Sequence, residues 1–236
     1  ICGHSAQEYH RVGDYSVDKC TGCAFIYVRN VPSDEFLAEC YRRQHGADDG
    51  GYAPDTRFHK TLKNWWFAKR IRRLAKGRKR VLEVGYANGN LLKALQRERV
   101  FEVEGIDYSE APLAHLKSLG LNVSRAALED KQYPDGHFDI VVGLHVLEHV
   151  QNPMRFIGEV RRVLSPHGRI YLQLPCVTYW RARLAGRKWK ALTPPYHLWF
   201  FSPKTIRLFL AKCGFRVISA HCLSHRAHLT VVAEKI

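Results

Sequence analysis

Short apolar runs alternate with amphipathic segments along most of this chain. Strands are predicted where apolar and β-branched residues cluster, at 81–85, 102–107, 138–144, 169–174, 215–222 and 228–234. Helices are predicted where apolar residues recur at helical spacing, at 34–45, 56–76, 90–98, 111–119, 153–164 and 203–213. Strands that alternate with helices form βαβ units, whose parallel sheet is covered on both faces. The pattern therefore predicts an α/β fold with a doubly wound, mostly parallel sheet.

The N-terminal part of the chain follows a different pattern. Residues 1 to about 30 contain strand-like segments and turns around three cysteines, and a loop rich in Gly and Asp occupies 46–54. We therefore expect a small module over 1–54 and a larger domain over 55–236. Within the larger domain, a cofactor half is expected over 77–175 and an acceptor-binding segment over 176–201.

Composition narrows the class of protein. The 46% apolar and 25% charged residues of this 236-residue chain exclude a disordered protein, and no uninterrupted apolar run is long enough to predict a membrane span. The N-terminal sequence predicts no signal peptide. Seven cysteines, an odd number, argue against a disulfide framework. A cytoplasmic location is therefore expected.

The net charge of +15 is unevenly distributed. Eleven Lys or Arg and no acid lie from Arg57 to Arg80, which we interpret as a solvated basic face. Thirteen Lys or Arg and no acid lie between Glu159 and Glu234, and this second run includes the aromatic segment 180–201. Positive charge there would attract an anionic partner, such as a nucleotide, a sugar phosphate, an acidic glycan or a nucleic acid.

A glycine turn and a carboxylate indicate a nucleoside cofactor. The strand predicted at 81–85 ends in the turn Gly85-Tyr86-Ala87-Asn88-Gly89, and a helix follows. Such a turn lets a ligand approach the backbone closely and directs helix N–H groups at it. Asp107 ends the next predicted strand, 18 residues after Gly89, where a carboxylate can accept both ribose hydroxyls.

The segment 83–89, E-V-G-Y-A-N-G, resembles motif I of the class I S-adenosylmethionine-dependent methyltransferases. Ala87 stands where that family has a glycine, so this position requires a negative φ or a tolerated alternative. Further similar segments are 105–109, 127–129, 135–142, 147–150, 156–164, 168–175 and 197–215. The resemblance covers about 60–236. It implies a Rossmann-like seven-stranded sheet, methyltransferase activity and S-adenosyl-L-methionine as the cofactor.

The resemblance also implies the cofactor-binding residues. By position these are Glu83, Gly85, Tyr86, Ala87, Gly89, Asp107, Tyr108, Ala127, Leu128 and His145. The turn would face the methionine part and Asp107 the ribose, with Tyr108 beside the adenosine and Leu128 against the adenine.

The sequence H-V-L-E-H at 145–149 also matches the H-x-x-E-H pattern of inverzincin proteases. Such a protease needs a further acidic ligand downstream, and after Glu159 the only acid is Glu234. The methyltransferase interpretation is therefore favoured, with His145 just beyond a parallel strand and close to the transferable methyl. Glu148 is interpreted as structural, and a divalent metal held by His145, Glu148 and His149 is a minor alternative.

Methyl transfer from a sulfonium is an in-line displacement, so the protein mainly aligns the reactants. A general base is needed only when the acceptor atom must lose a proton, as a hydroxyl or a carbon beside a carbonyl does. The candidate catalytic residues are His145, His149, Tyr196 and His197, with the histidines as bases and the tyrosine orienting the acceptor.

The N-terminal cysteines predict a structural zinc site. Cys20-Thr21-Gly22-Cys23 is a C-x-x-C knuckle, and Cys2 and His4 precede it. Together they resemble the zinc ribbon of some sugar and natural-product methyltransferases. The fourth ligand is either His4 or a residue upstream of Ile1. The strand-like stretch 24–28 fits a ribbon better than a redox C-x-x-C, which would open a helix. Cys40, Cys176, Cys213 and Cys222 are expected to pack.

Three functions remain. The first is C- or O-methylation of an anionic small molecule, such as a nucleotide-linked sugar, a glycan precursor or a natural product. The second is methylation of a nucleic acid, in particular RNA, through the basic surface. The third, a non-catalytic scaffold protein, is disfavoured because the glycine turn and Asp107 are intact.

Overall fold

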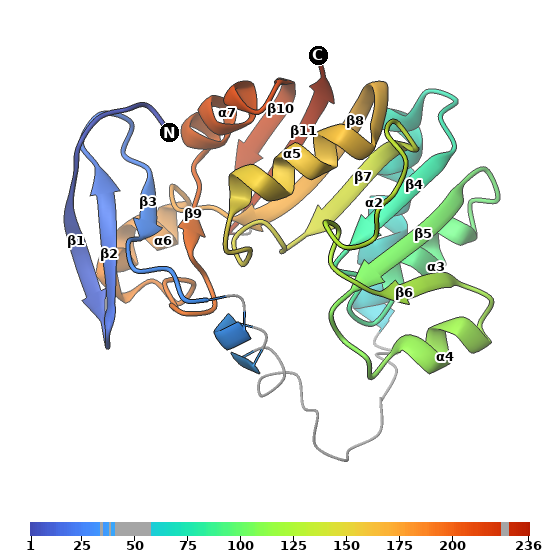
Figure 1. Cartoon of the computed structure of the whole chain (residues 1–236), viewed down its shortest axis with the longest axis horizontal. Helices are drawn as coiled ribbons and strands as arrows, with labels where there is room; N and C mark the ends of the chain where they lie inside the picture. The colour runs from blue at the N-terminus through green and yellow to red at the C-terminus, as the bar shows by residue number, and fades with distance from the viewer. Residues whose placement is uncertain (34, 38, 41–57, 223–226) are drawn as a thin grey trace.

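The computed structural model describes residues 1–33, 35–37, 39–40, 58–222 and 227–236. Its larger sheet contains β4 (Arg80–Val84), β5 (Glu102–Asp107), β6 (Asn122–Arg125), β7 (Phe138–Leu144), β8 (Leu164–Pro175), β10 (Phe215–Cys222) and β11 (His228–Lys235). The order is β10-β11-β8-β7-β4-β5-β6, and only β11 runs antiparallel to its neighbours. The predicted doubly wound, mostly parallel, seven-stranded sheet is confirmed (Figure 1).

The strand order reverses between β4 and β7. From β4 the chain adds β5 and β6 on one side and then returns to pair β7 with the other side of β4. Parallel sheets bind ligands at the carboxyl edge beside such a reversal, because the loops that leave the two strands diverge there. Gly85, Asp107 and His145 all lie at this edge.

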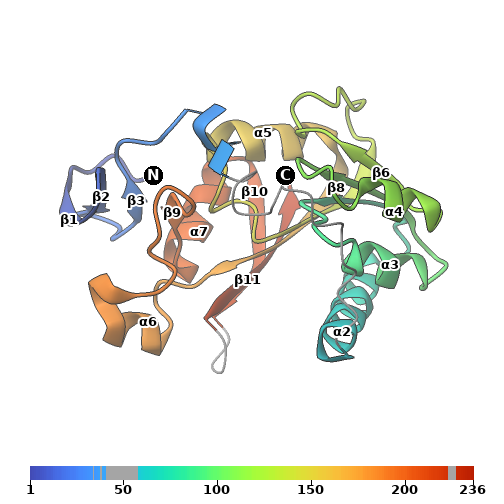
Figure 2. The ribbon, with the colours of Figure 1, turned by 90° about the horizontal axis from the view of Figure 1, so that it is seen from below.

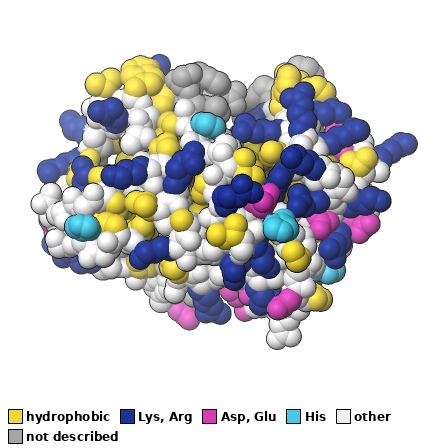
Figure 3. Space-filling model, turned by 90° about the horizontal axis from the view of Figure 1, so that it is seen from above, with side chains coloured by type: hydrophobic (Ala, Val, Ile, Leu, Met, Phe, Trp, Pro, Cys, Tyr) yellow, Lys and Arg dark blue, Asp and Glu magenta, His cyan; other side chains and the backbone are white. Residues whose placement is uncertain are grey.

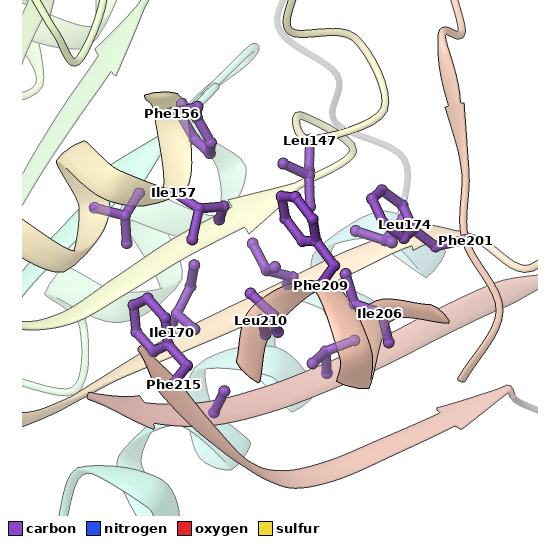
Figure 4. Close-up of a cluster of buried hydrophobic side chains, with 14 of the residues drawn as sticks. Leu147, Phe156, Ile157, Ile170, Leu174, Phe201, Ile206, Phe209, Leu210 and Phe215 are labelled. Atoms are coloured by element: carbon purple, nitrogen blue, oxygen red, sulfur yellow. The ribbon is translucent and has the colours of Figure 1, made fainter. Parts of the chain in front are cut away.

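Helices cover both faces of the sheet (Figure 2). On one face α2 (Phe58–Ala75) and α3 (Asn90–Gln96) bury an apolar stripe against β4, β7 and β8. On the other face α5 (Pro153–Val163) and α7 (Pro203–Lys212) pack on β8 and β11, as the close-up in Figure 4 shows. A short helix, α4 (Leu113–Ser118), covers β5 and β6.

Local sequence explains where two of these helices begin. The Asn152 side chain accepts the backbone N–H of Arg155, and a proline follows as the first residue of α5. Ser202 and Thr205 form a capping box at the start of α7. Such caps satisfy backbone donors that have no partner within the helix.

Some short elements of the larger domain were not expected from the sequence. The strand β6 is only four residues long, which is too short to show an alternating pattern. The helix α6 (Trp180–Ala185) and a 3-10 turn (Gly186–Lys188) occupy part of the acceptor-binding segment. The helix predicted at 34–45 and the boundary at 54/55 lie largely outside the described residues. No helix in the described part of the chain is long and apolar enough to cross a membrane.

A second sheet joins the N-terminal module to the acceptor-binding segment. It contains β1 (Ala6–Val12), β2 (Tyr15–Cys20), β3 (Ile26–Val28) and β9 (Trp199–Phe200), and β9 pairs antiparallel with β3 (Figure 1). Val17, Val28, Leu198 and Phe200 share one buried cluster beneath it. The N-terminal module therefore supports the backbone that carries His197.

One expectation about the cysteines is wrong. Cys176 and Cys222, which were expected only to pack, form a disulfide. Cys176 directly follows β8 and Cys222 ends β10, and the sheet places their Cα atoms 6.0 Å apart. This separation is within the normal range for a disulfide. An odd cysteine count cannot exclude a pair that the sheet brings together across 46 residues of sequence.

Candidate functional site

The glycine turn lies at the carboxyl end of β4. Gly85 and Gly89 have φ values of +75° and +64°, and a Cβ atom at these positions would lie 2.6 Å from Val146 and 2.5 Å from Leu116. Both positions therefore require glycine for backbone conformation and for space. Ala87 has a φ of +46°, so it takes the left-handed conformation rather than a negative φ.

Asp107, at the end of β5, fastens this turn. Its Oδ2 accepts the backbone N–H of Ala87 at 2.7 Å, and its Oδ1 accepts that of Ser109 at 2.8 Å. A carboxylate has about four acceptor positions, so the two oxygens retain capacity for two hydroxyl groups. Asp107 therefore fits the predicted contact with a ribose.

Glu83 is a buried carboxyl in β4, two residues before Gly85. Its side chain is only 3% exposed, and Oε2 has no hydrogen-bond partner among the described residues. Burial and the negative charge of Asp107 raise the pKa of Glu83 well above its ordinary value. A buried acceptor without a partner costs free energy unless a ligand supplies a donor. The ammonium group of a bound S-adenosylmethionine is such a donor, so these residues fit the predicted cofactor.

Of the other predicted cofactor residues, Leu128 lies beside Asp107, whereas the Tyr86 side chain points into the core. Leu128 is buried, and Ala126 donates its N–H to the carbonyl of Asp107, which brings the 127–128 segment beside the ribose carboxylate. Tyr108 is largely exposed. The Tyr86 ring lies instead in the apolar cluster under α4, where burial raises the pKa of its hydroxyl to about 12. The side chain of Tyr86 is thus a core residue, and only its backbone belongs to the turn.

His145 lies where the sequence predicts, directly after β7. Its backbone N–H donates to the carbonyl of Gln173 at the end of β8, and its φ is +58°. Its Nδ1 lies 2.9 Å from Oε1 of Glu148, and its ring contacts His228 at 4.9 Å between centroids. His228 was not recognised from the sequence, because only the pairing of β11 with β8 brings it to this edge.

Glu148 is a buried carboxyl that bonds to His145. It is fully buried, and Oε2 has no hydrogen-bond partner in the described part of the chain. Although burial raises the pKa of this carboxyl, the hydrogen bond with His145 and the nearby His149 bring it below the ordinary value. Glu148 is therefore a buried anion.

The loop before β9 contacts Glu148 and the neighbouring His149. The Nδ1–H of His149 donates to the carbonyl of Tyr196 at 2.7 Å, and Leu198 donates its N–H to the carbonyl of Glu148. The His197 ring lies 4.8 Å from that of His149. Burial, with a smaller contribution from His197, lowers the pKa of His149, so its imidazole is neutral at pH 7. Two predicted catalytic histidines therefore meet, although 48 residues separate them, and Tyr196 holds one of them through its carbonyl.

The N-terminal cysteines form a separate cluster. One ligand atom each of Cys2, Cys20 and Cys23 lies within 4.8 Å of the others, and the Cys2 and Cys20 sulfurs are 3.4 Å apart. The backbone N–H of His4 and the neighbouring thiols lower the pKa of Cys2 to about 7, which favours the thiolate that zinc binds. The His4 ring lies over Gly22 and is not part of the three-thiol group. The zinc and its fourth ligand remain predictions.

A cleft of about 800 Å³ lies at the opposite edge of the sheet, lined by residues that include Lys76, Arg80, Asp139 and Arg169. Arg80 pairs with Asp139, and Arg169 pairs with Glu234. These ion pairs join neighbouring strands, β4 with β7 and β8 with β11.

The comparison with known proteins identifies the family of this chain. The methyltransferase domain family (Methyltransf_23) matches residues 58–220. The chain belongs to this family. The resemblance to the class I methyltransferases is thus confirmed, and every residue predicted to bind the cofactor lies within the matched range.

Curated relatives match part of the methyltransferase domain. The ubiquinone biosynthesis O-methyltransferase of Pseudomonas aeruginosa is 36% identical over 101 residues, which is 40% of this chain and 43% of that protein. A probable S-adenosylmethionine-dependent methyltransferase of Mycobacterium tuberculosis is 32% identical over 124 residues, which is 48% of this chain and 44% of the relative. The matches thus span less than half the length of these relatives.

Solved structures support the fold. A S-adenosylmethionine-dependent methyltransferase from Mesorhizobium loti has a TM-score of 0.59 at 18% identity, covering 73% of this chain and 98% of that one. The [4+2]-cyclase SpnF has a TM-score of 0.65 at 16% identity, covering 87% and 97%. Because a protein described as a cyclase shares this fold, the fold alone does not define the reaction.

Proposed function

We propose that this protein transfers the methyl group of S-adenosyl-L-methionine to an oxygen or carbon of an anionic small molecule, such as a nucleotide-linked sugar, a glycan precursor or a natural product. The bound cofactor supplies a methyl group on a sulfonium sulfur. The residues at this edge would hold the acceptor atom in line with that methyl group, so that the carbon–sulfur pair could leave on sulfur, and a base among them would take the proton of a hydroxyl acceptor.

The observation that carries this proposal is the contact between the loop before β9 and the carboxyl edge. Tyr196 and Leu198 bond to His149 and Glu148, directly beyond β7 and beside the cofactor turn. The whole region from 160 to 233, which includes this loop, contains no acid and is rich in Lys and Arg. Such a field concentrates anionic acceptors at the site.

Different residues at this edge would bind the cofactor and the acceptor. Glu83, the glycine turn and Asp107 would hold the cofactor. His145, His149 and His197 would lie on the acceptor side, and Tyr196 would orient the acceptor as well as hold His149. The relatives named as ubiquinone biosynthesis O-methyltransferases favour oxygen over carbon as the accepting atom.

An acceptor screen with methyl-labelled cofactor tests the proposal. Nucleotide-linked sugars, other phosphorylated sugars and acidic phenols should be tested beside neutral analogues of the same compounds. We expect label transfer to anionic acceptors, and transfer only to neutral acceptors or to RNA would contradict the proposal. RNA remains the second candidate because of the net charge of +15.

A further inference from the structure

The cleft at the amino edge of the larger sheet carries an excess of positive charge. Its volume of about 800 Å³ is in the range of cavities that bind small molecules. Its walls are the loop between α2 and β4 and the amino ends of β4, β5, β7 and β8. The described residues that line it include five cations and two acids, and none is aromatic. The cations are Lys76, Arg78, Lys79, Arg80 and Arg169, and the acids are Glu102 and Asp139.

Buried contacts of Arg169 fix one wall of this cleft. Arg169 is only 9% exposed, and its Nε and Nη2 donate to Oε2 of Glu234 at 3.2 and 3.1 Å. Its Nη1 donates to the carbonyl of Leu74 at 2.6 Å, in the last turn of α2. Arg169 therefore fastens the end of this helix to β8. The loop that follows, residues 76–79, starts from a fixed support.

Asp139 fixes the other end of this loop. Its Oδ2 accepts the backbone N–H groups of Lys79 and Arg80 at 3.1 and 3.0 Å, and its Oδ1 accepts the hydroxyl of Ser165. Although burial raises the pKa of Asp139, the two backbone N–H groups bring it below the ordinary value. Asp139 is therefore an anion that holds the start of β4, and Arg80 is its ion-pair partner.

The loop itself presents cations that the fold does not use. The side chains of Lys76, Arg78 and Lys79 form no hydrogen bond or ion pair with any residue that the structure describes. Lys76 and Lys79 are exposed, and Arg78 is half-buried. Like charges this close in sequence repel one another, and an anion placed among them would relieve the repulsion.

Arg80 adds donors deeper in the cleft. Only its Nη2 is engaged, at 3.4 Å from both the carbonyl of Gly136 and Oδ1 of Asp139. A guanidinium has five N–H donors in a planar fork. Nε and Nη1 of Arg80 therefore retain donors without a partner in the described part of the chain, and paired guanidinium donors match two oxygens of one phosphate.

We propose that this cleft binds a short phosphate chain, either free polyphosphate or the di- or triphosphate group of a nucleotide. Lysine and arginine are the usual partners of phosphate oxygens. All the unused cations come from five consecutive residues, 76–80, so the ligand needs several negative charges close together. Phosphates that share bridging oxygens meet this need. The inference does not depend on the acceptor proposed above, which would bind at the carboxyl edge.

Two features of the cleft limit what it can recognise. No aromatic side chain lines the described part of it, so nothing there would stack on a nucleotide base. Glu102, at the start of β5, is exposed and forms no ion pair with any described residue. Its carboxylate would repel an anionic ligand, so removing its charge should strengthen binding.

Titration calorimetry with tripolyphosphate and the full chain tests the site. We expect about one equivalent to bind, and Lys76→Gln with Lys79→Gln should raise the Kd about 10-fold. Arg181→Gln with Arg183→Gln is the matched control, because it removes the same charge at α6 and should change the Kd less than about 2-fold. Glu102→Gln should lower the Kd about 3-fold. An unchanged affinity for S-adenosylmethionine shows that each variant is folded.

Comparison of ligands separates a phosphate site from other anion sites. ATP and GTP should bind with Kd values within about 3-fold of that for tripolyphosphate, because the cleft would contact only the phosphates. A preference of more than about 10-fold for one base would overturn the proposal, as would failure of tripolyphosphate to bind. Equal weakening by the two double variants would mean general attraction to the net charge. Binding of single-stranded RNA without binding of tripolyphosphate would assign the cleft to a nucleic acid instead.

Discussion

The Asp107 carboxylate accepts the backbone N–H of Ala87 at 2.7 Å, so the residue that fits the ribose also holds the glycine turn. Ala87 lies in the left-handed region, where a non-glycine residue costs about 1–2 kcal/mol. The hydrogen bond stabilises this conformation in the absence of any ligand. The cofactor site is therefore organised by two segments, the end of β5 and the turn after β4, that hold each other in place.

Asp107→Ala is expected to weaken cofactor binding about 100-fold. The change removes two hydrogen bonds to the turn and its flank and all bonds to the ribose, and hydrogen bonds to a charged group contribute about 1.5–3 kcal/mol each. Titration calorimetry with S-adenosylmethionine measures the effect. Asp139→Ala is the matched control, because Asp139 accepts the N–H groups of Lys79 and Arg80 at the opposite end of β4. Equal affinity in both variants would refute the ribose assignment.

Ala87→Gly is expected to stabilise the protein by about 0.5–1 kcal/mol. Glycine relieves the cost of a positive φ, and its greater freedom in the unfolded chain offsets part of that gain. Urea denaturation measures the change. Ala94→Gly, in the middle of α3, should have the opposite sign and destabilise by about 1 kcal/mol. A destabilising effect at both positions would mean that φ at Ala87 is negative.

Local patterns and spacing predicted most of the fold and the cofactor side of the site. A strand, a glycine turn and an acid after the next strand are consecutive in the chain, and parallel pairing must bring Gly85 and Asp107 to one edge. The acceptor side was less predictable. The contact of His149 with His197, the pairing of β3 with β9 and the Cys176–Cys222 disulfide join distant segments. No local period encodes such contacts, since they depend on how the loop before β9 packs.

Glu83→Gln is expected to weaken cofactor binding about 10-fold at pH 7 and to stabilise the free protein. The raised pKa of Glu83 means that the folded chain holds this proton more tightly than the unfolded chain does. Stability is therefore lost as the pH rises from the ordinary carboxyl range through the raised pKa, and glutamine, which carries no charge, removes this loss.

The ammonium group of the cofactor needs the ionised form of Glu83. Affinity in the unchanged protein should therefore increase as the pH rises from the ordinary carboxyl range through the raised pKa of Glu83. The glutamine variant should show no such increase. Calorimetry across this range, in buffers of different ionisation enthalpy, also measures the proton released on binding. A pH-independent affinity in the unchanged protein would contradict the ammonium contact.

The N-terminal cluster is expected to contain about one zinc per chain. Cys20→Ser and Cys23→Ser should each lose the metal and destabilise the sheet of β1, β2, β3 and β9, because thiolate ligation contributes to folding directly. Cys213→Ser should retain the zinc, since Cys213 lies in the larger domain next to Met154. Plasma emission analysis of the purified variants gives the metal content. A folded, zinc-free unchanged chain would refute the ribbon.

Substitutions in the basic segment 180–201 would distinguish a small acceptor from RNA. Arg181 and Arg183 are exposed on α6, and Arg73 and Lys76 form an equally charged, exposed pair at the end of α2. A small anionic acceptor should respond only to the first pair, so replacing both arginines with glutamine should raise its KM about 10-fold and leave the affinity for the cofactor unchanged.

An RNA acceptor would bind over a wider area, because Lys and Arg side chains are spread across the face shown in Figure 3. Both double variants should then weaken binding, and each lost phosphate contact should reduce the slope of log K against log salt by about 1. We expect a shallow salt dependence and an effect confined to the α6 pair. Steep salt dependence with equal effects of the two double variants would favour the RNA methyltransferase over the small-molecule enzyme.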